Sequence, residues 1–112
     1  MMRDYVKHFG LANVFVEYHA GSIVRYCLSR KAKFILRGVR NTSDLQKEMD
    51  LSTGYRGVDD SVETICMFAN PQLVMVSSSL VRQLANVDES ISQYVLPSVE
   101  QKLTDCIKPK QE

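Results

Sequence analysis

The sequence predicts an α/β fold with a parallel sheet, and three observations carry that prediction. Short apolar runs at residues 34–36 and 64–68 are typical of buried strands. Segments with apolar residues at helical spacing alternate with these runs. The 112 residues contain no internal repeat and no low-complexity linker, so we expect one domain over residues 1–112.

The first third of the chain is expected to form a helix, a strand and a second helix. The helix over residues 3–9 should end at Gly10, because glycine readily adopts the left-handed conformation that closes a helix. Residues 14–18 include three β-formers in a row and predict a strand. The second helix should begin at residues 21–22, with one apolar face. That face comprises Ile23, Val24, Cys27 and Leu28.

The middle of the chain predicts a strand, a basic turn and a capped helix. A tight turn over residues 37–40 should follow the buried strand at residues 34–36. Ser43 and Gln46 have the spacing of a capping box, which marks the start of a helix. We expect this helix over residues 44–51, after which a polar, glycine-containing segment should loosen it.

The next segment predicts a third strand and a serine-capped helix. The strand at residues 64–68 is apolar almost throughout, as expected for a parallel strand covered on both faces. A turn at residues 70–72 and an extended piece at residues 73–76 should follow. The serines at residues 77–79 should cap a helix, since serine hydroxyls accept the amide hydrogens of a first turn.

The C-terminal part predicts one more helix. An apolar segment at residues 91–96 precedes Pro97. Ser98 and Gln101 then have the spacing of a capping box. The tail over residues 108–112 is expected to be frayed, as chain ends commonly are.

Composition excludes several classes of protein. The net charge of +1 argues against a general nucleic-acid binder. No apolar run approaches the length that crosses a bilayer, and the first residues lack the apolar core of a signal peptide, so a cytoplasmic location is expected. Cys27, Cys66 and Cys106 are far apart and lie among apolar residues, which predicts reduced thiols in or near the core.

The strand, turn and helix of the middle segment suggest a phosphate site. Arg37 and Arg40 flank Gly38 just before a helix N-terminus, where amide hydrogens, the helix dipole and guanidinium groups all favour an anion. The alternative is that both arginines are surface ion-pair partners of Asp44 and Glu48. The residues by themselves leave both interpretations open.

The triple serine suggests a second part of such a site. Ser77, Ser78 and Ser79 combine hydroxyls with first-turn amides, which suits a phosphate or a nucleotide base, although simple helix capping is the alternative. The serines follow the third strand, and ligands of open α/β sheets gather where strands end. No Walker loop and no dinucleotide glycine fingerprint is present. His8 and His19 lie outside any nucleophile motif and are expected to face solvent or cap helices.

Taken together, these segments resemble phosphopantetheine adenylyltransferase, over about residues 13–103. The resemblance rests on Arg-Gly-Val-Arg after a strand, Ser-Asp, Glu48-Met49, Val-Ser-Ser-Ser-Leu-Val-Arg after the next strand, and Val-Leu-Pro. It implies the Rossmann-like parallel sheet of a nucleotidyltransferase. It also implies transfer of AMP from ATP to 4′-phosphopantetheine, giving dephospho-coenzyme A and pyrophosphate.

The resemblance implies roles for individual residues. Arg37 matches the arginine that contacts the phosphate of phosphopantetheine. Mg²⁺ with ATP as cofactor and a homohexamer are implied as well, with no nucleic acid and no membrane as partner. The implied ATP-binding residues are Gly38, Val39, Arg40, Glu48, Val76, Ser77, Ser78 and Ser79.

The sequence also departs from the family pattern. The family begins with a strand and a Thr-x-Gly-His box, which have no counterpart here, so we expect an N-terminally truncated form and identify no catalytic residue. Lys47 replaces a common tyrosine, and Gly54-Tyr55 replaces a Met-Asn pair near the pantetheine arm. The sheet should close by pairing residues 14–18 with residues 34–36, or take strands from another copy.

Two other functions remain as alternatives. A truncated chain could be catalytically inactive and keep only nucleotide binding or an oligomer surface. The basic stretch between residues 20 and 41, with six basic residues and no acid, could instead bind RNA or another polyanion. Near-neutral net charge argues against nucleic acid as a partner.

Overall fold

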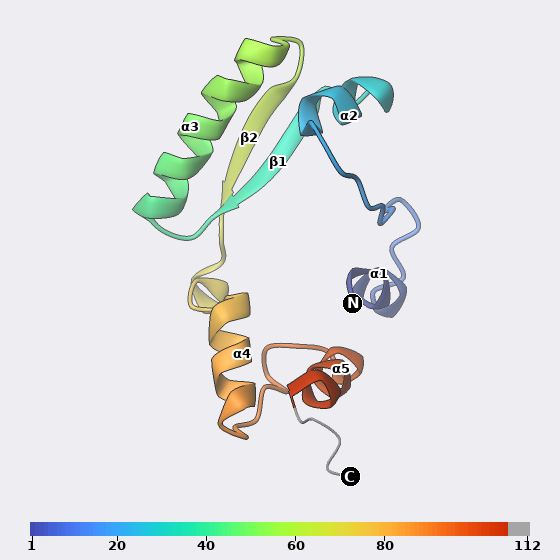
Figure 1. Cartoon of the computed structure of the whole chain (residues 1–112), viewed down its shortest axis with the longest axis vertical. Helices are drawn as coiled ribbons and strands as arrows, with labels where there is room; N and C mark the ends of the chain where they lie inside the picture. Colours follow the sequence, from blue (N-terminus) through green and yellow to red (C-terminus); the bar gives the residue numbers. More distant parts are fainter. Residues whose placement is uncertain (108–112) are drawn as a thin grey trace. The chain divides into compact units, whose positions relative to one another are not determined.

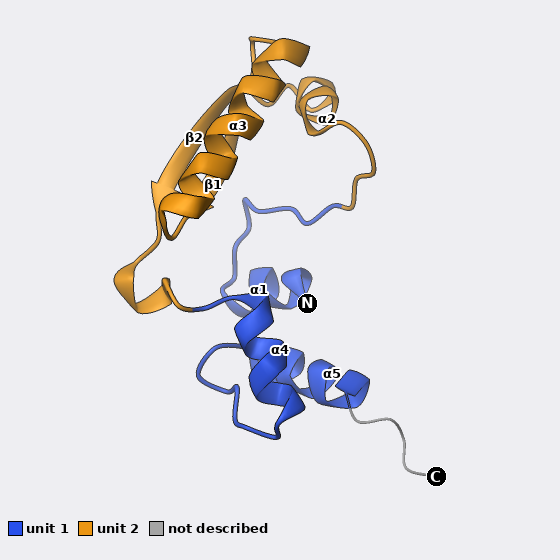
Figure 2. Ribbon diagram, turned by 60° about the vertical axis from the view of Figure 1, so that its left-hand side comes forward, with its two compact units in different colours: residues 1–17, 76–112 blue, residues 18–75 orange. Residues whose placement is uncertain are grey.

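The structure is a computed structural model, and it describes residues 1–107. Unit 2 comprises residues 18–75, and unit 1 comprises residues 1–17 with residues 76–112 (Figures 1 and 2). The tail over residues 108–112, which was expected to be frayed, lies outside the described residues. One nucleotidyltransferase-like domain over residues 1–112 stays a prediction.

Unit 2 is built on a parallel pair of strands. Strand β1 (Phe34–Val39) pairs with strand β2 (Glu63–Phe68), so that Leu36 lies opposite Ile65. Helix α3 (Thr42–Val58) connects the two strands and packs on both of them (Figure 1). The parallel order follows from this crossover, because a helix between two strands returns the chain to the same end of the sheet. The predicted α/β class with a parallel sheet is confirmed.

Helix α3 begins and ends differently from the prediction. Its N-cap is Asn41, whose side-chain oxygen accepts the backbone N–H of Asp44 at 2.9 Å. The predicted capping box is therefore wrong, because asparagine is a strong cap and starts the helix before Ser43. The helix also continues through two glycines to Val58 instead of loosening after residue 51. The chain between Leu51 and Val58 contains no proline, so the hydrogen-bond ladder is not interrupted.

The predicted tight turn at residues 37–40 is also wrong. Arg37, Gly38 and Val39 continue strand β1, where Gly38 lies opposite Met67 in the register. Pairing with β2 offers these three residues regular backbone hydrogen bonds, which a turn would forgo. The chain leaves the strand only at Arg40 and reaches the helix cap within one more residue.

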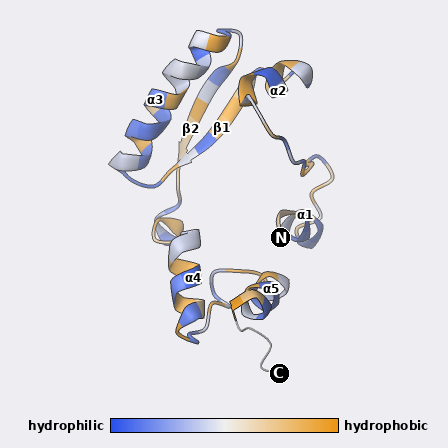
Figure 3. Cartoon of the chain, in the orientation of Figure 1, coloured by the Kyte–Doolittle hydropathy of each residue, from blue (hydrophilic) through white to orange (hydrophobic). Residues whose placement is uncertain are grey.

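The two strands are covered less than their apolar sequences predicted. Figure 3 shows hydrophobic residues along both strands. Phe34 and Leu36 are nevertheless 61% and 62% exposed, and Met67, on the same face of β2, is 58% exposed. In contrast, Val39, which lies on the other face of β1 from Leu36, is buried. The expectations of a buried strand at residues 34–36 and of a strand at residues 64–68 covered on both faces are therefore wrong within the described residues, because only one face packs against a helix.

A small core closes the far end of unit 2. Helix α2 (Ile23–Ser29) starts at Ser22, whose hydroxyl accepts the N–H of Arg25, and places Val24 and Cys27 against Val62. This confirms the second helix and the core position of one cysteine. Cys66 and Cys106 are exposed free thiols, contrary to prediction. For Cys66 the reason is that its apolar neighbours Ile65 and Met67 are themselves exposed.

Unit 1 begins with helix α1 (Met2–His8), which ends as predicted. Gly10 has a φ of 61°, and the N–H of Leu11 bonds to the carbonyl of Val6 at 3.1 Å. Residues 14–18 form no strand and join no sheet in the part of the chain that the structure describes, so this prediction is wrong. The predicted closure with residues 34–36 fails with it, since a β-forming sequence becomes a strand only beside a partner.

Helices α4 (Ser78–Asn86) and α5 (Pro97–Ile107) complete unit 1. They bury Val81 and Val99, together with Ile91 of the connecting loop, and Lys102 of α5 bonds to Asp4 of α1 at 2.8 Å. The expected extended piece at residues 73–76 is wrong: the 3₁₀ helix η1 (Pro71–Leu73) and a turn occupy it. Among the described residues, no helix is both long and apolar enough to span a bilayer.

Replacing Asn41 with alanine should lower the free energy of unfolding by about 1 kcal/mol, because the first turn of α3 loses its acceptor. Asn41→Asp keeps an oxygen at the same place and is the matched control. Urea unfolding followed by circular dichroism measures both variants. Equal midpoints for the two variants would show that this cap does not stabilise the helix.

Candidate functional site

Arg37 and Glu48 form a two-point ion pair between strand and helix. Arg37 Nε donates to Glu48 Oε2 at 2.8 Å, and Arg37 Nη2 donates to Glu48 Oε1 at 2.9 Å. The alternation of side chains along β1 turns Arg37 toward α3, and Glu48 lies in the second turn of that helix. The side chain of Glu48 is 10% exposed, whereas that of Arg37 is 43% exposed.

The pair fixes the charge of both groups. The hydrogen bond from Arg37 holds the pKa of Glu48 below its ordinary value, against the opposing effect of burial. The same hydrogen bond raises the pKa of Arg37. Both side chains are therefore ionised at neutral pH. A guanidinium has five N–H donors, so the two bonds to Glu48 leave three that donate to no group among the described residues.

Arg40 forms the second predicted ion pair. Its Nε donates to Asp44 Oδ2 at 3.0 Å, and its backbone N–H donates to the same oxygen at 3.1 Å. These bonds, the side-chain one first, lower the pKa of Asp44. The ion-pair alternative is therefore present in the structure for both arginines. Pairing with Glu48 uses only two of the five N–H donors of Arg37, so Arg37 can keep this ion pair and also bind a phosphate.

Strand β1 delivers Arg37, Gly38, Val39 and Arg40 to its carboxyl end. The N-terminus of α3 begins two residues later, after Asn41. An α-helix N-terminus carries partial positive charge, so an anion at this end of the strand would be attracted both by the helix and by the arginines. The five residues from β1, α3 and the link between them that the sequence predicted as a phosphate and ATP site thus lie in one compact unit.

The serine segment is in unit 1 and has two kinds of member. Ser77 is the N-cap of α4, since its hydroxyl accepts the N–H of Leu80 at 3.1 Å, so capping accounts for this residue. Ser77 and Ser78 also line a cavity of about 490 Å³, together with Val76. Ser79 is exposed and lies outside the lining of that cavity.

The cavity beside the serines is mostly apolar. Val81 and Val99 contribute to its walls, and Arg82 adds a positive charge. Tyr5 of α1 and Tyr94 add aromatic rings that the sequence reasoning missed. Arg82 was detectable, because it lies four residues after Ser78 on the same helix face, but no periodicity links Tyr5 to α4.

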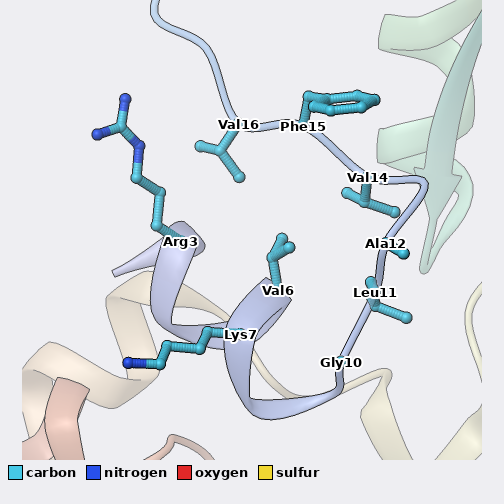
Figure 4. Close-up of a pocket in the computed structure, with 9 residues that line it drawn as sticks. All are labelled: Arg3, Val6, Lys7, Gly10, Leu11, Ala12, Val14, Phe15 and Val16. Carbon is cyan, nitrogen blue, oxygen red and sulfur yellow. The ribbon is translucent and has the colours of Figure 1, made fainter.

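A second cavity of unit 1 lies between α1 and the segment that follows it. Figure 4 shows Arg3 and Lys7 of α1 at its side, with the apolar side chains of Val6 and Val16 beside them. Its volume is about 410 Å³, and it holds none of the predicted site residues.

The remaining titratable groups form no further centre in residues 1–107. No group of three or more His, Cys, Asp and Glu side chains in this range could hold a metal ion. His8 and His19 are both exposed, as predicted, and His19 stacks on Tyr26 with ring centroids 4.4 Å apart. The predicted ATP residues fall into two groups, one on β1 and α3 and the link between them in unit 2, and one at the start of α4 in unit 1.

Comparison with known proteins bears on the predicted resemblance. The chain is 37% identical over 94 residues to a protein of Lactiplantibacillus plantarum named phosphopantetheine adenylyltransferase. The resemblance is confirmed. The aligned part makes up 84% of this chain and 58% of the relative, so the chain spans a little over half the length of the curated relative it matches. No family model matches the chain.

Similarity to a phosphopantetheine adenylyltransferase agrees with the fold described above. The name of the relative describes an enzyme that transfers an adenylyl group to phosphopantetheine. The mixed α/β architecture with a parallel strand pair is consistent with a nucleotidyltransferase-like fold.

The ion pair of Glu48 should make stability depend on pH. Because the folded state holds the pKa of Glu48 below 4.5, its stabilising effect is complete above that pH and is lost as the pH falls through the lowered value. From about pH 7 to about pH 3, the urea midpoint of the wild type should therefore fall more than that of Glu48→Gln. The other carboxylates titrate in both proteins and cancel in this difference. An equal drop would contradict the assignment.

Proposed function

We propose that the chain takes part in the transfer of AMP from ATP to 4′-phosphopantetheine, which yields dephospho-coenzyme A and pyrophosphate. The observation that carries the proposal is the 37% identity over 94 residues with the L. plantarum phosphopantetheine adenylyltransferase. The pairing of Arg37 and the cavity beside Ser77 and Ser78 support it, because each offers groups suited to one of the two substrates.

The chemistry needs positioning and positive charge from the protein. A phosphate oxygen of 4′-phosphopantetheine attacks the α-phosphorus of ATP and forms a new P–O bond. The bond from the α-phosphorus to the oxygen that bridges to the β-phosphate breaks, and pyrophosphate leaves with that electron pair. Negative charge collects on phosphate oxygens throughout, so guanidinium and amide donors held in place are the appropriate catalytic groups.

Arg37 is proposed as the group that binds the phosphate of 4′-phosphopantetheine. Its guanidinium is partly exposed and keeps three N–H donors after pairing with Glu48. Two of these donors, one on each terminal nitrogen, point in the same direction by the geometry of the group. They suit two oxygens of one phosphate, which is the usual fork-like contact of arginine with phosphate esters.

ATP is proposed to contact the other predicted residues. Gly38, Val39 and Arg40 lie at the carboxyl end of β1, where backbone amides and a cation are close to a helix N-terminus. The segment with Val76 and the serines 77–79 would hold the base and phosphates. A mostly apolar cavity of about 490 Å³ with two hydroxyls at its edge fits a planar nucleobase.

Magnesium is proposed to arrive with the nucleotide. No cage of three or more acidic, histidine or cysteine ligands exists within residues 1–107, and Mg²⁺ in nucleotide sites is commonly held by the phosphates with few protein ligands. The donor set therefore fits an ion bound to ATP. We also propose a cytoplasmic location and self-association, with neither nucleic acid nor membrane as partner.

The chain should bind ATP, and binding should stabilise it against unfolding. ATP at a hundredfold excess over its Kd should raise the free energy of unfolding by about 2.7 kcal/mol, by mass action. Thermal unfolding with and without magnesium-ATP measures the effect, and AMP is the control ligand without the β- and γ-phosphates. An unchanged midpoint at millimolar ATP would contradict nucleotide binding.

Activity is tested by pyrophosphate release from magnesium-ATP and 4′-phosphopantetheine. Saturable turnover by the wild type, with a higher KM for 4′-phosphopantetheine in Arg37→Ala, would support the proposal. The matched control is Arg25→Ala, which removes an arginine from helix α2 instead of β1. ATP binding without turnover would favour the alternative of a nucleotide-binding chain that has no catalysis of its own.

A further inference from the structure

Strand β1 has an outer edge with no strand beside it. The sheet of the described residues has two strands, so β1 pairs with β2 on one side only. We propose that residues 14–18 of a second copy of this chain add to the outer edge of β1, and that two copies exchange these segments reciprocally to form a dimer. The inference rests on the self-association proposed above, for which it names the contact surface, and not on the transfer of AMP.

The hydrogen bonds of the strand pair identify the backbone groups that point outward. The N–H of Glu63 donates to the carbonyl of Lys33 at 2.8 Å. The N–H of Ala69 donates in the same way to the carbonyl of Val39 at 2.9 Å. In a parallel pair, alternate residues of a strand direct both backbone groups to the same neighbour, so the odd-numbered residues of β1 face β2. The residues of β1 whose backbone groups point away from β2 are Phe34, Leu36 and Gly38.

This outer edge of β1 lacks the usual protection against a further strand. Its backbone groups have no hydrogen-bond partner among the described residues. The strand contains no proline, and its pairing with β2 runs over six residues without a bulge. On the outer edge of β2, in contrast, the N–H of Thr64 bonds to the carboxylate of Glu63 at 3.2 Å. Among the described residues, β1 therefore offers the better edge for strand addition.

Residues 14–18 have the properties of the added strand. Their sequence, Val-Phe-Val-Glu-Tyr, is rich in β-formers and contains neither proline nor glycine. Their backbone forms neither a helix nor a turn, so no regular structure has to be broken before they pair. Phe15 and Tyr18 are 84% and 91% exposed, so both side chains are available for contacts with a second copy.

The surroundings of residues 14–16 match the uncovered face of the sheet. Two mainly apolar hollows of about 410 and 390 Å³ lie between these residues and Val6 of helix α1, and Figure 4 shows the larger one. Because α1 ends only a few residues before the segment, the added strand would bring this helix with it. Leu36 and Met67, which are largely exposed on the uncovered face, would then meet apolar surface. One addition thus gives the open edge a partner and the exposed face a cover.

A second copy fits as the partner because each chain supplies both halves of the contact. Within one copy, residues 14–18 join no sheet among the described residues. Reciprocal exchange between two copies pairs both segments with both β1 edges, which closes the assembly as a dimer. It also gives each sheet a third strand, which is the number that a sheet with one apolar face needs for stability of its own.

The first experiment measures the oligomeric state of the purified full chain by sedimentation velocity, from micromolar to submillimolar concentration. The wild type should form a dimer. Phe15→Pro and Val16→Pro, made separately, are matched controls for each other, because alternate residues of an added strand face β1. One of the two should raise the Kd of the dimer by about tenfold or more, since proline removes a donor from the ladder and leaves its acceptor unpaired. The other should have little effect, because its N–H would point away from β1.

Hydrogen exchange followed by NMR tests the receiving edge without a substitution. The N–H groups of Ile35, Arg37 and Val39 face β2, so they should exchange slowly at every concentration. Those of Leu36 and Gly38 should exchange rapidly in dilute samples and slowly once the dimer forms. Alternate N–H groups within residues 14–18 should slow over the same range of concentration.

Four results would overturn the inference. A chain that stays monomeric, with rapid exchange in residues 14–18, would show no strand addition and no self-association. A monomer with slow exchange in these residues would show that the segment pairs within its own chain. A dimer that neither proline weakens would use another surface, so self-association would stand without strand exchange. Assemblies that keep growing with concentration would show one-way addition. Binding of ATP and release of pyrophosphate are measured separately, so each of these results leaves the proposed transfer of AMP open to its own test.

Discussion

The ion pair between Arg37 and Glu48 is the interaction on which unit 2 depends most directly. It joins strand β1, whose carboxyl end carries the candidate site, to helix α3, which covers one face of the sheet. Without Arg37, helix α3 would carry a buried carboxylate with no cation, which is strongly unfavourable. Without Glu48, a charged side chain on the covered face of β1 would lack its partner beside the buried Val39. The same contact that completes the packing also sets the direction of a phosphate-binding group.

A second constraint is the number of strands that the described residues supply. One face of the β1–β2 pair packs on α3, and the opposite face leaves Leu36 and Met67 about three-fifths exposed. Apolar side chains gain stability only when another element covers them, so this face adds little to the folded state. The core of unit 2 is correspondingly small and centres on Val24, Cys27 and Val62 at the end where α2 packs.

Local signals in the sequence were sufficient to identify the helices and β2, although both ends of α3 were placed wrongly, and the other failures discussed here occurred where distant partners decide. The glycine that ends α1 and the serine that caps α4 act within a few residues, so the sequence alone identifies them. Residues 14–18 have a strand-forming sequence but pair with no strand among the described residues, and the turn expected around Gly38 became strand because β2 pairs with it. For Arg37 the sequence offered phosphate binding or an ion pair, and the structure shows that one guanidinium has donors for both.

The central claim is that Arg37 binds a substrate phosphate while Glu48 continues to hold it. A crystal structure of the chain with 4′-phosphopantetheine tests this most directly. The account predicts phosphate oxygens within hydrogen-bond distance of Arg37 Nη1 and Nη2, with Nε still bonded to Glu48 Oε2. A phosphate bound elsewhere, or one that draws Arg37 away from Glu48, would contradict it.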